Sequence, residues 1–375
     1  MKKKLLFCAF NLEVGGVEKC LVNLVNSLDK SKYDITILLQ VKEGKLLNNV
    51  DKNVHIIGYN LSKNKNFIIK KISNIFNFFK IIIKNHNKYD FSACYATGYV
   101  PSSIVALFAS KNNAIWMHTN ISTYMDNYKP YENKKWSNTK KCKKFINRIF
   151  FRLYKKHFFV SNNGMNAYLN IYPNDSNKCI MCHNIIDYES ILNFSKEKIT
   201  SDLNLKNEKV LLNVSRHTEY DKRLSRIIKA AIKLKKENYK FKIIFVGDGT
   251  EHKDYVKLVK DNKLDDCIIF VGEKANPFPY YKLADAFILS SAFEGFPTTF
   301  LEALVLNKPI ITTDVSDARD DIDNKYGIVV PNNDESIYDG IKEYLDNGFV
   351  IKEKFDPKKF NQDSIDKLES VINND

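Results

Sequence analysis

The feature that most constrains the fold is an alternation of short apolar runs with longer helical patterns, which occurs twice along the chain. The first series runs from residues 4–10 (KLLFCAF) to residues 157–161 (HFFVS), and the second from residues 209–215 (KVLLNVS) to residues 309–314 (PIITTD). This alternation is typical of parallel strands joined by crossover helices. The sequence therefore predicts an α/β fold: two facing, Rossmann-like, doubly wound domains with an interdomain cleft outside the carboxyl ends of their strands.

A polar, mixed stretch at residues 187–207 separates the two series and is predicted to be the linker. We predict an N-terminal domain over residues 1–190 and a C-terminal domain over residues 191–355. Residues 356–375 are predicted to pack back toward the N-terminal domain. A chain of 375 residues is long enough for two or three domains.

The charge of the chain is divided unevenly between its halves. Residues 1–190 carry 29 Lys and Arg against 12 Asp and Glu, whereas residues 191–375 carry 29 against 32. A basic face attracts polyanions such as nucleic acid, anionic lipid or phosphorylated substrates. We expect no nucleic-acid partner, because no recognisable nucleic-acid module is present and the half with the clearest motifs is not basic.

Two basic segments with interleaved aromatic residues lie in the first half, at residues 64–88 and 134–156; the second carries ten Lys and Arg and no acid. Amphipathic basic segments of this kind can lie on an anionic membrane. One hypothesis is therefore peripheral docking at the inner leaflet. The alternative, which the sequence leaves open, is that these helices cover the N-terminal sheet and that their lysines are solvated.

The start of the chain and its cysteines predict a cytoplasmic protein. The apolar run at residues 5–10 is shorter than a secretory core, and no small-residue cleavage site follows it. Seven cysteines without framework spacing fit a reducing compartment. The predicted location is the cytoplasm, with docking at the inner face of the cell membrane as the further hypothesis.

Two glutamates, Glu294 and Glu302, flank the sequence Gly-Phe-Pro-Thr-Thr after a predicted strand. Glu294 is predicted in the loop beyond the carboxyl end of that strand, where ligands collect in such sheets. Pro297 suits the first turn of a helix, Thr298 or Thr299 can satisfy its free amides, and its amino terminus can hold a diphosphate. The alternative for Glu302 is a capping box with Thr299, which would give it a local structural role.

A second cluster places Arg216 just after a predicted strand and Lys222 at the start of the next helix. Two cations at that point can hold a diphosphate leaving group. The alternative is that both are solvated loop charges.

A glycine pair and a histidine follow predicted strands in the first half. Gly15 and Gly16 allow a backbone to approach a ligand at the start of a helix, although the third glycine of a dinucleotide fingerprint is missing. His118 follows the predicted strand in AIWMH. A lone histidine at this position can have a structural or a functional role, and the sequence leaves both open. No metal constellation is predicted.

Together these motifs resemble a family, the retaining glycosyltransferases of the two-Rossmann-domain (GT-B) type, family 4. The likeness covers nearly the whole chain, and its most specific part is the Glu294…Glu302 element. The motifs that carry it are GGVE at 15–18, His118, HNIID at 183–187, Ser215-Arg216…Lys222, VGDGTE at 246–251, FVGE at 270–273 and ADAFILSSAFEGFPTTFLEAL at 284–304. Ser215 and Ile185 replace glycines common in the family, and the Arg216-to-Lys222 spacing is one residue longer.

The resemblance implies a role for each matching position. The implied catalytic residues are Glu294, Arg216, Lys222 and His118, with Arg216 and Lys222 on the diphosphate, Glu294 on the hydroxyls of the transferred sugar and His118 on the donor sugar. The implied donor-binding residues are Gly15, Gly16, Arg216, Lys222, Gly272, Glu273, Glu294, Gly295, Phe296, Pro297, Thr298, Thr299 and Glu302, with Glu302 on the ribose and Gly272 and Glu273 at the base.

The resemblance further implies a glycosyltransferase that moves a sugar, with retention, from a nucleotide-sugar donor to a glycan or lipid-linked acceptor. UDP-sugar is the favoured donor, the C-terminal domain binds it, the N-terminal domain binds the acceptor, and bacterial capsule or O-antigen assembly is the expected setting. We expect no cofactor and no metal. The open alternatives are a sugar-nucleotide epimerase or phosphorylase of the same fold and a non-catalytic sugar-nucleotide-binding protein.

Overall fold

The structure is a computed structural model of the chain that describes residues 1–59, 66–95, 100–119, 149, 151–199, 203, 205 and 208–373. The chain divides into two compact units. The first unit comprises Met1–Ile186 with Lys358–Asp375, and the second comprises Asp187–Pro357. Each is an α/β unit built on one parallel sheet, which confirms the predicted fold class of two Rossmann-like domains.

The sheet of the first unit has the order β3-β2-β1-β4-β5-β6-β7, and its paired strands are parallel. Its strands are β1 (Lys3–Ala9), β2 (Tyr33–Leu39), β3 (His55–Gly58), β4 (Phe91–Cys94), β5 (Asn113–Met117), β6 (Lys156–Phe159) and β7 (Cys179–Met181). The helices are α1 (Gly16–Ser27), η1 (Lys45–Asn49), α2 (Phe67–Asn85), α3 (Val100–Ala109), α6 (Asn162–Leu169), η2 (Pro173–Lys178) and α14 (Pro357–Asn373).

Strand β1 shows why this chain forms a central parallel strand. Five consecutive residues, from Leu5 to Ala9, are buried, as expected for a strand whose two faces are both covered by helices. Strands β2 and β4 pair with β1 on its two sides, and α3 packs against β1, β4 and β5. The predicted strand at the start of the chain is therefore an interior strand of the sheet.

The sheet of the second unit has the order β10-β9-β8-β11-β12-β13 and is also parallel. Its strands are β8 (Lys209–Val214), β9 (Phe241–Val246), β10 (Ile268–Gly272), β11 (Ala286–Leu289), β12 (Ile310–Thr313) and β13 (Gly327–Val330). The helices are α7 (Tyr188–Phe194), α8 (Leu224–Lys236), α9 (His252–Asp261), α10 (Phe278–Leu283), α11 (Thr298–Val305), α12 (Ala318–Asp321) and α13 (Ser336–Asn347).

Helix α8 illustrates how the second unit buries its core. Its apolar residues recur at three- and four-residue spacing and form one buried face, made of Leu224, Ile227, Ile228, Ala231 and Leu234. Three lysines lie in its last turn, where cations complement the negative end of the helix dipole. The buried face joins residues of β9, β11 and α13 in one hydrophobic cluster.

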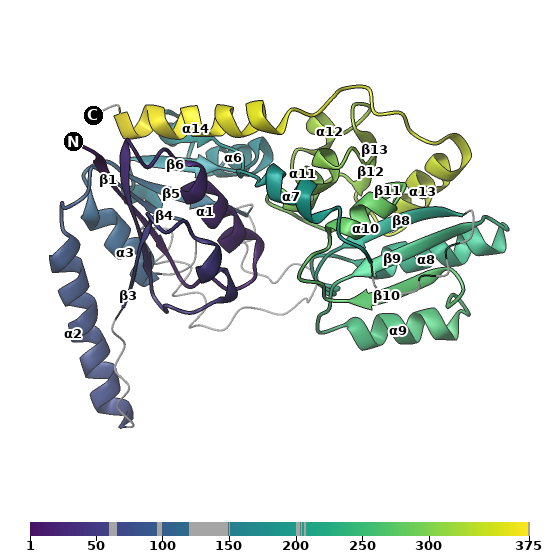
Figure 1. Cartoon of the computed structure of the whole chain (residues 1–375), viewed down its shortest axis with the longest axis horizontal. Helices are drawn as coiled ribbons and strands as arrows, with labels where there is room; N and C mark the ends of the chain where they lie inside the picture. Colours follow the sequence, from purple (N-terminus) through teal and green to yellow (C-terminus); the bar gives the residue numbers. More distant parts are fainter. Residues whose placement is uncertain are drawn as a thin grey trace. The chain divides into compact units, whose positions relative to one another are not determined.

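The unit boundaries differ from the predicted ones at both points where the chain passes from one unit to the other. The first unit ends at residue 186 and not at 190, and the chain re-enters it at residue 358 and not at 356. The predicted linker is also wrong in part, because Tyr188–Phe194 form α7 and belong to the second unit. Figure 1 shows α14 lying along the first unit, beside the termini.

Helix α14 is fixed to the first unit by hydrogen bonds to distant backbone. The side-chain oxygen of Asn361 accepts from the backbone N–H of Ile186 (3.0 Å), and its amide donates to the Ile186 carbonyl (2.8 Å). Lys3 donates to the carbonyl of Ile372, and Asn112 donates to that of Val371. Asn361 thus satisfies both backbone groups of Ile186, which would otherwise be buried without these partners.

Two further findings concern membranes. Among the described residues, no helix combines the length and the hydropathy that a membrane span requires. Most of the predicted basic segment 134–156 lies outside the described residues, whereas most of segment 64–88 is described and contains α2.

Asn361 gives a test of how α14 holds the first unit. In Asn361→Leu both backbone groups of Ile186 lose a buried partner, at a cost of about 1–3 kcal/mol each. We expect the melting temperature of the first unit to fall by at least about 4 °C. Thermal unfolding followed by calorimetry measures it. Gln362→Leu, at the exposed neighbouring position, is the control, and an equal loss in both variants would contradict the assignment.

Candidate functional site

The strand order of the second unit creates one natural ligand site. The chain runs outward from β8 to β9 and β10, and then returns to the other side of β8 as β11. In sheets with such a reversal of strand order, ligands bind in a crevice outside the carboxyl ends of the strands, so we expect the crevice of this unit between the loops that follow β8 and β11. These loops, residues 215–223 and 290–297, carry the predicted Lys222 and Glu294.

Lys222 and Glu294 meet at this crevice. The ammonium group of Lys222 lies 2.5 Å from Oε1 of Glu294, and the hydroxyl of Ser291 donates to the same oxygen at 2.7 Å. The side chains of Lys222 and Glu294 are 18% and 13% exposed. A pair this shielded is screened by salt less than a surface ion pair is. The structure thus brings together two charged residues predicted in separate motifs, although Lys222 lies in the loop before α8 and not at the start of the helix as predicted.

The loop that carries Glu294 is held from several sides. The Ser290 hydroxyl donates to the carbonyls of Lys222 and Arg223, and Ala292 N–H donates to the Asp221 carbonyl at 2.8 Å. Three side chains beyond the loop donate to its carbonyls: Thr313 to Ser291, Asn332 to Ala292 and Ser316 to Gly295. A loop with this many partners positions Glu294 before any ligand arrives.

Arg226 is a supporting residue that the sequence analysis missed. It is buried on the apolar face of α8, where its guanidinium donates to the Ser290 carbonyl (3.2 Å), to Asn332 (2.8 Å) and to Asp334 (2.9 Å). The Arg226 hydrogen bond holds the pKa of the Asp334 carboxyl below its usual value. A charged residue inside the apolar pattern of a helix was the available signal, since such residues are rarely buried without partners.

Arg216 lies apart from the Lys222–Glu294 pair. Its side chain is 69% exposed, and its guanidinium lies 3.7 Å from the carboxylate of Asp221. Asp221 belongs to the same loop as Lys222 and also bonds Ala292 through its carbonyl. Arg216 therefore belongs to the loop after β8 but exposes its side chain, and its contact with a diphosphate stays a prediction.

The helix that follows Glu294 begins differently from the prediction. Helix α11 starts at Thr298 with Pro297 as the N-cap, and no side chain caps it, so neither the Thr298 or Thr299 cap nor the capping box with Glu302 forms. Glu302 is buried instead, and its Oε2 accepts from the Tyr281 hydroxyl at 3.0 Å. The helix start is thus uncapped by side chains beside Gly295 and Phe296, which suits it to an anion.

The predicted base-site residues lie at the end of β10: Gly272 is its last residue and Glu273 follows it. Gly272 has φ +74°, a left-handed conformation that favours glycine, and nothing lies within 4 Å of the position a Cβ would take. Its carbonyl accepts from Gly247 N–H after β9, while Glu273 is exposed. These positions are at the carboxyl edge of the same sheet, and their role at a base stays a prediction.

In the first unit, Gly15 and Gly16 stand at the start of the helix after β1, as predicted: Gly16 is the first residue of α1. Gly15 is the N-cap of α1, and a Cβ on it would lie 2.2 Å from the carboxylate of Glu18. Gly16 has nothing within 4 Å of a Cβ position, so its backbone is open. Burial raises the pKa of Glu18. The start of α1 therefore offers an accessible backbone, as a phosphate site requires.

His118 directly follows β5 in the first unit and is buried. Its ring lies 4.7 Å from the ring of Tyr95, and burial lowers the pKa of His118 to about 4. Its Nε2 atom is buried and has no hydrogen-bond partner within the described ranges. A buried nitrogen without a partner costs about 1–3 kcal/mol, which a ligand can recover. The role that the resemblance gives to His118 stays a prediction.

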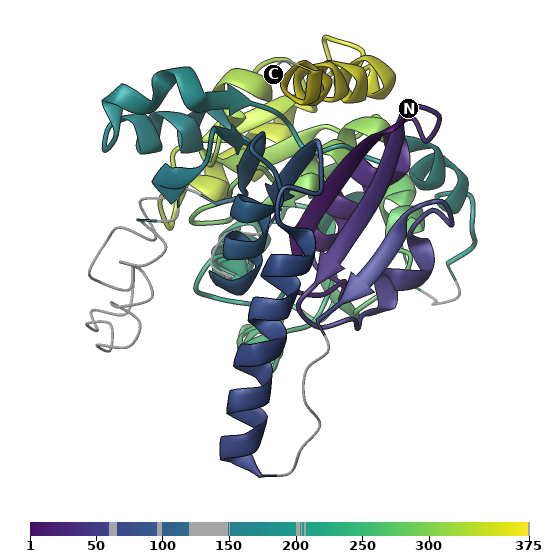
Figure 2. The same cartoon turned by 90° about the vertical axis from the view of Figure 1, so that its left-hand side faces the viewer.

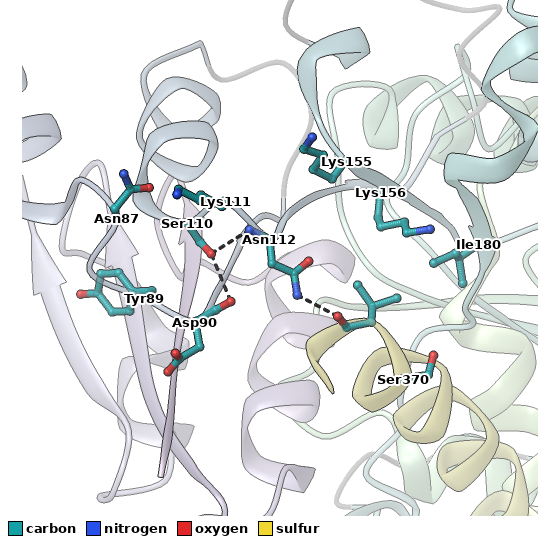
Figure 3. A pocket seen from close by; sticks show the side chains of 11 residues that line it. Asn87, Tyr89, Asp90, Ser110, Lys111, Asn112, Lys155, Lys156, Ile180 and Ser370 are labelled. Carbon is teal, nitrogen blue, oxygen red and sulfur yellow. Dashed lines mark hydrogen bonds between the residues drawn. The ribbon is translucent and has the colours of Figure 1, made fainter. Parts of the chain in front are cut away.

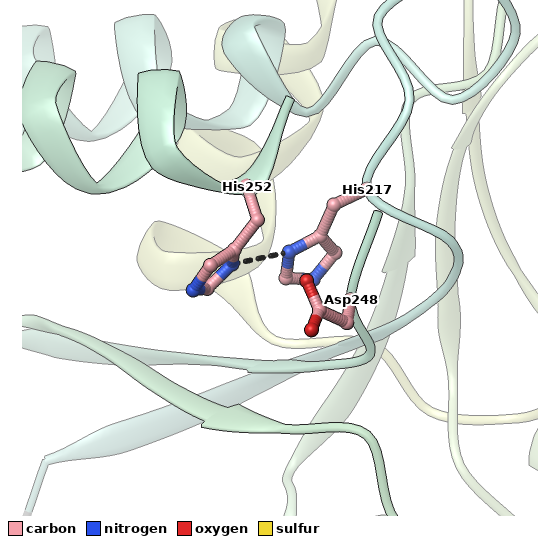
Figure 4. A group of neighbouring side chains, drawn as sticks. All are labelled: His217, Asp248 and His252. Atoms are coloured by element: carbon pink, nitrogen blue, oxygen red, sulfur yellow. Dashed lines mark hydrogen bonds between the residues drawn. The ribbon is translucent and has the colours of Figure 1, made fainter. Parts of the chain in front are cut away.

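Within the part of the chain that the structure describes, one group of three side chains has metal-ligand chemistry: His217, Asp248 and His252, whose ligand atoms lie within 4.8 Å of one another (Figure 4). The two Nδ1 atoms are 2.8 Å apart, which is a hydrogen-bond distance. Because one ring must then carry the proton between them, that nitrogen has no lone pair for a metal. We assign no metal to this group; burial and His252 lower the pKa of His217 to about 4.

A pocket of about 870 Å³ lies at the opposite, amino edge of the first unit's sheet (Figure 3). It is lined by residues that precede β4, β5 and β6 and by the end of α14, with Asn87, Asp90, Lys111, Asn112, Lys156 and Ser370 among them. Several of its polar groups are already paired: Ser110 donates to the Asp90 carbonyl, and Asn112 donates to Val371. Ligands of parallel sheets bind at carboxyl ends, so this pocket is not the candidate site.

Comparison with protein families gives a match that covers most of the second unit. Residues 195–364 match the family model described as "Glycosyl transferases group 1". This range contains the loops of Lys222 and Glu294 and most of the second unit. This part of the chain is therefore similar to the group 1 glycosyltransferases.

Individual relatives share parts of the chain. An N-acetylgalactosamine-N,N'-diacetylbacillosaminyl-diphospho-undecaprenol 4-alpha-N-acetylgalactosaminyltransferase from Campylobacter jejuni is 27% identical over 194 residues, 51% of each protein. The O-antigen biosynthesis glycosyltransferase WclY from Escherichia coli is 26% identical over 162 residues, 43% of this chain and 44% of that protein. The matches thus span about half the length of these relatives or less.

Solved structures share the fold over the whole chain. The Anabaena protein Alr3699/HepE in complex with UDP superposes with a TM-score of 0.73 at 17% identity, covering 99% of this chain and 100% of that one. At this identity the likeness concerns the fold alone, which is that of the GT-B proteins.

The buried histidine gives a prediction of pH dependence. The pKa of His118 is about 4 in the folded protein, against about 6.5 when exposed. Between these values the unfolded state binds a proton that the folded state does not, so the free energy of unfolding falls as the pH is lowered from about 6.5 toward 4. In His118→Gln this decrease should be smaller, because the unfolded variant has one fewer histidine to protonate.

Urea unfolding at a series of pH values measures this effect. The exposed His86 supplies the matched control variant, His86→Gln. An unchanged pH dependence in His118→Gln would show that His118 is protonated in the folded state, contrary to its burial.

Proposed function

We propose that the chain is a glycosyltransferase that moves a sugar from a nucleotide-sugar donor, UDP-sugar by preference, to a glycan or lipid-linked acceptor with retention of configuration. The premise is the similarity of residues 195–364 to the group 1 glycosyltransferases. The single observation that supports the proposal most is the Lys222–Glu294 pair at the strand-order reversal of the second unit. A cation and a sugar-binding carboxylate at one crevice fit the needs of sugar transfer from a diphosphate.

In the proposed reaction the carbon–oxygen bond between the sugar and the diphosphate breaks, so negative charge develops on the diphosphate. Donors already in place stabilise that charge, and the loss of one typically costs about 2.7–4 kcal/mol. An ammonium group has three N–H donors, so Lys222 can keep its bond to Glu294 and still donate to phosphate oxygens. The open start of α11, from Phe296 to Thr299, would supply backbone amides.

Arg216 and the two glutamates would complete the donor site. The exposed side chain of Arg216 would turn to the diphosphate and exchange its ion pair with Asp221 for one with a phosphate oxygen. Glu294 would accept from hydroxyls of the transferred sugar, and Glu302 would meet the ribose. The leaving diphosphate would take the proton of the acceptor hydroxyl. With two cations and helix amides at the phosphates, the reaction is proposed to need no metal.

The acceptor and the location are the remaining parts of the proposal. The Campylobacter relative is named for a diphospho-undecaprenol-linked sugar and the Escherichia relative for O-antigen biosynthesis. By analogy we propose a lipid-linked acceptor in bacterial surface-polysaccharide assembly, bound by the first unit. The basic first half would then hold the protein peripherally at the anionic inner face of the cell membrane.

The cation pair is tested by separate alanine variants. Lys222→Ala and Arg216→Ala should each lower turnover at least about a hundredfold, because each removes charge stabilisation of the leaving diphosphate. Release of UDP and of the transferred sugar, followed with a radiolabelled donor, measures it and separates transfer from epimerase or phosphorylase products. Lys229→Ala, exposed on α8, is the control. Transfer close to the wild-type rate in both test variants would refute the assignment.

The donor is tested by thermal shift with UDP-, GDP- and ADP-sugars. We expect UDP-sugars to raise the melting temperature most, because a ligand that binds the folded state alone stabilises it. The shift should persist in excess EDTA if no metal is required. A larger shift with GDP- or ADP-sugars would reassign the base, and loss of every shift in EDTA would refute metal independence.

A further inference from the structure

Helix α2 of the first unit exposes an unusual amount of apolar surface. Among the side chains of α2 that the structure describes, seven large apolar ones are exposed, with Ile68, Phe76 and Ile83 at 67%, 72% and 76%; they are Ile68, Ile69, Ile72, Ile75, Phe76, Phe79 and Ile83. Single exposed apolar residues are normal on a protein surface, but a continuous patch marks an interaction site.

These seven residues form one face of the helix. At about 100° per residue they fall within an arc of about 120°. The residues that pack on the first unit's core lie on a different arc: Phe78, Ile81 and Ile82 contact the cluster around Tyr59 and Val105. The exposed stripe is therefore not the face by which α2 joins its own unit.

The amino-terminal half of α2 stands away from the unit. Its core contacts come from Phe78 onward, and Figures 1 and 2 both show the first turns extending beyond the sheet of the first unit. Asn66 caps this end by accepting from the N–H groups of Ile68 and Ile69. The helix is thus formed and capped without packing against its exposed side.

The charges beside the stripe have one sign. Residues 66–88 contain five lysines and no Asp or Glu. On the helix, Lys71 and Lys80 fall on either side of the apolar arc, and both are exposed. Lysines in these places can bury their stems along an apolar layer and keep their ammonium groups at its polar boundary.

We propose that α2 is the membrane-binding element of this protein: it lies in the plane of an anionic bilayer with its stripe among the acyl chains and its lysines at the headgroups. An apolar face with a basic border is what such an interface binds. A second copy of the chain fits less well, because two stripes face to face would bring their like-charged borders together. The proposal extends the proposed function. It takes the lipid-linked acceptor from that function, whereas the exposed stripe of α2 is observed independently of it.

The test is co-sedimentation of the full-length protein with vesicles at low salt. Vesicles of equal parts phosphatidylcholine and phosphatidylglycerol should bind the protein, and vesicles of phosphatidylcholine alone should bind it less. The double variant Phe76→Ser with Phe79→Ser should partition at least about tenfold more weakly, because it removes two apolar groups from the stripe. Phe194→Ser, a half-exposed aromatic residue of the second unit, is the matched control and should bind as the wild type does.

A second variant separates charge from apolar insertion. Lys71→Glu with Lys80→Glu should lose the preference for phosphatidylglycerol. The thermal shift with UDP-sugar should be the same in all these variants and in the wild type, which shows that the fold and the donor site are intact whether or not the membrane proposal holds.

Two results would overturn the proposal. Binding of Phe76→Ser with Phe79→Ser at the wild-type level would leave a membrane location standing but would remove α2 from it. No vesicle binding, together with self-association that the same double variant abolishes, would assign the stripe to a second copy of the chain.

Discussion

The candidate site depends on one property of the second sheet, the reversal of strand order at β8. Because β9 and β11 lie on opposite sides of β8, the loop after β8 and the loop after β11 meet although they are far apart in the sequence. Lys222 and Glu294, 72 positions apart, become an ion pair for this reason. Ser290 then ties the two loops by bonding the carbonyls of Lys222 and Arg223. The strand order brings the two loops together, and side-chain hydrogen bonds hold them in place.

The loop of Glu294 also shows how polar groups are used to hold a site rigid. Its carbonyls are taken by Thr313, Asn332, Ser316 and Arg226, which come from three other segments of the second unit. Buried hydrogen bonds of this kind add modestly to stability, but leaving one partner unpaired is costly, so the arrangement resists distortion. The rigid carboxylate contrasts with the exposed Arg216, whose long side chain can reorient when a ligand arrives.

Much of the fold could be predicted from the sequence, because buried parallel strands are continuous apolar runs. The central strands β1, β8, β9 and β11 are of this kind. Strand β3 was missed because none of its four residues is buried, and β13 was missed because it lies beyond the predicted second series, which ends at residue 314. The Thr299–Glu302 pattern allowed a local cap, yet the Glu302 carboxylate is buried and accepts from the Tyr281 hydroxyl. Arg226 and Asn361 were also missed, since their partners lie far away in the sequence, from 64 to 175 positions.

The pairing of Asn361 with Ile186 has a consequence for synthesis of the chain. The first unit is discontinuous, since the whole second unit is inserted between Ile186 and its closing helix. On the ribosome, the second unit emerges and can fold while the first unit still lacks Asn361, which bonds both backbone groups of Ile186. The backbone groups of Ile186 therefore stay open to water until α14 has been synthesised.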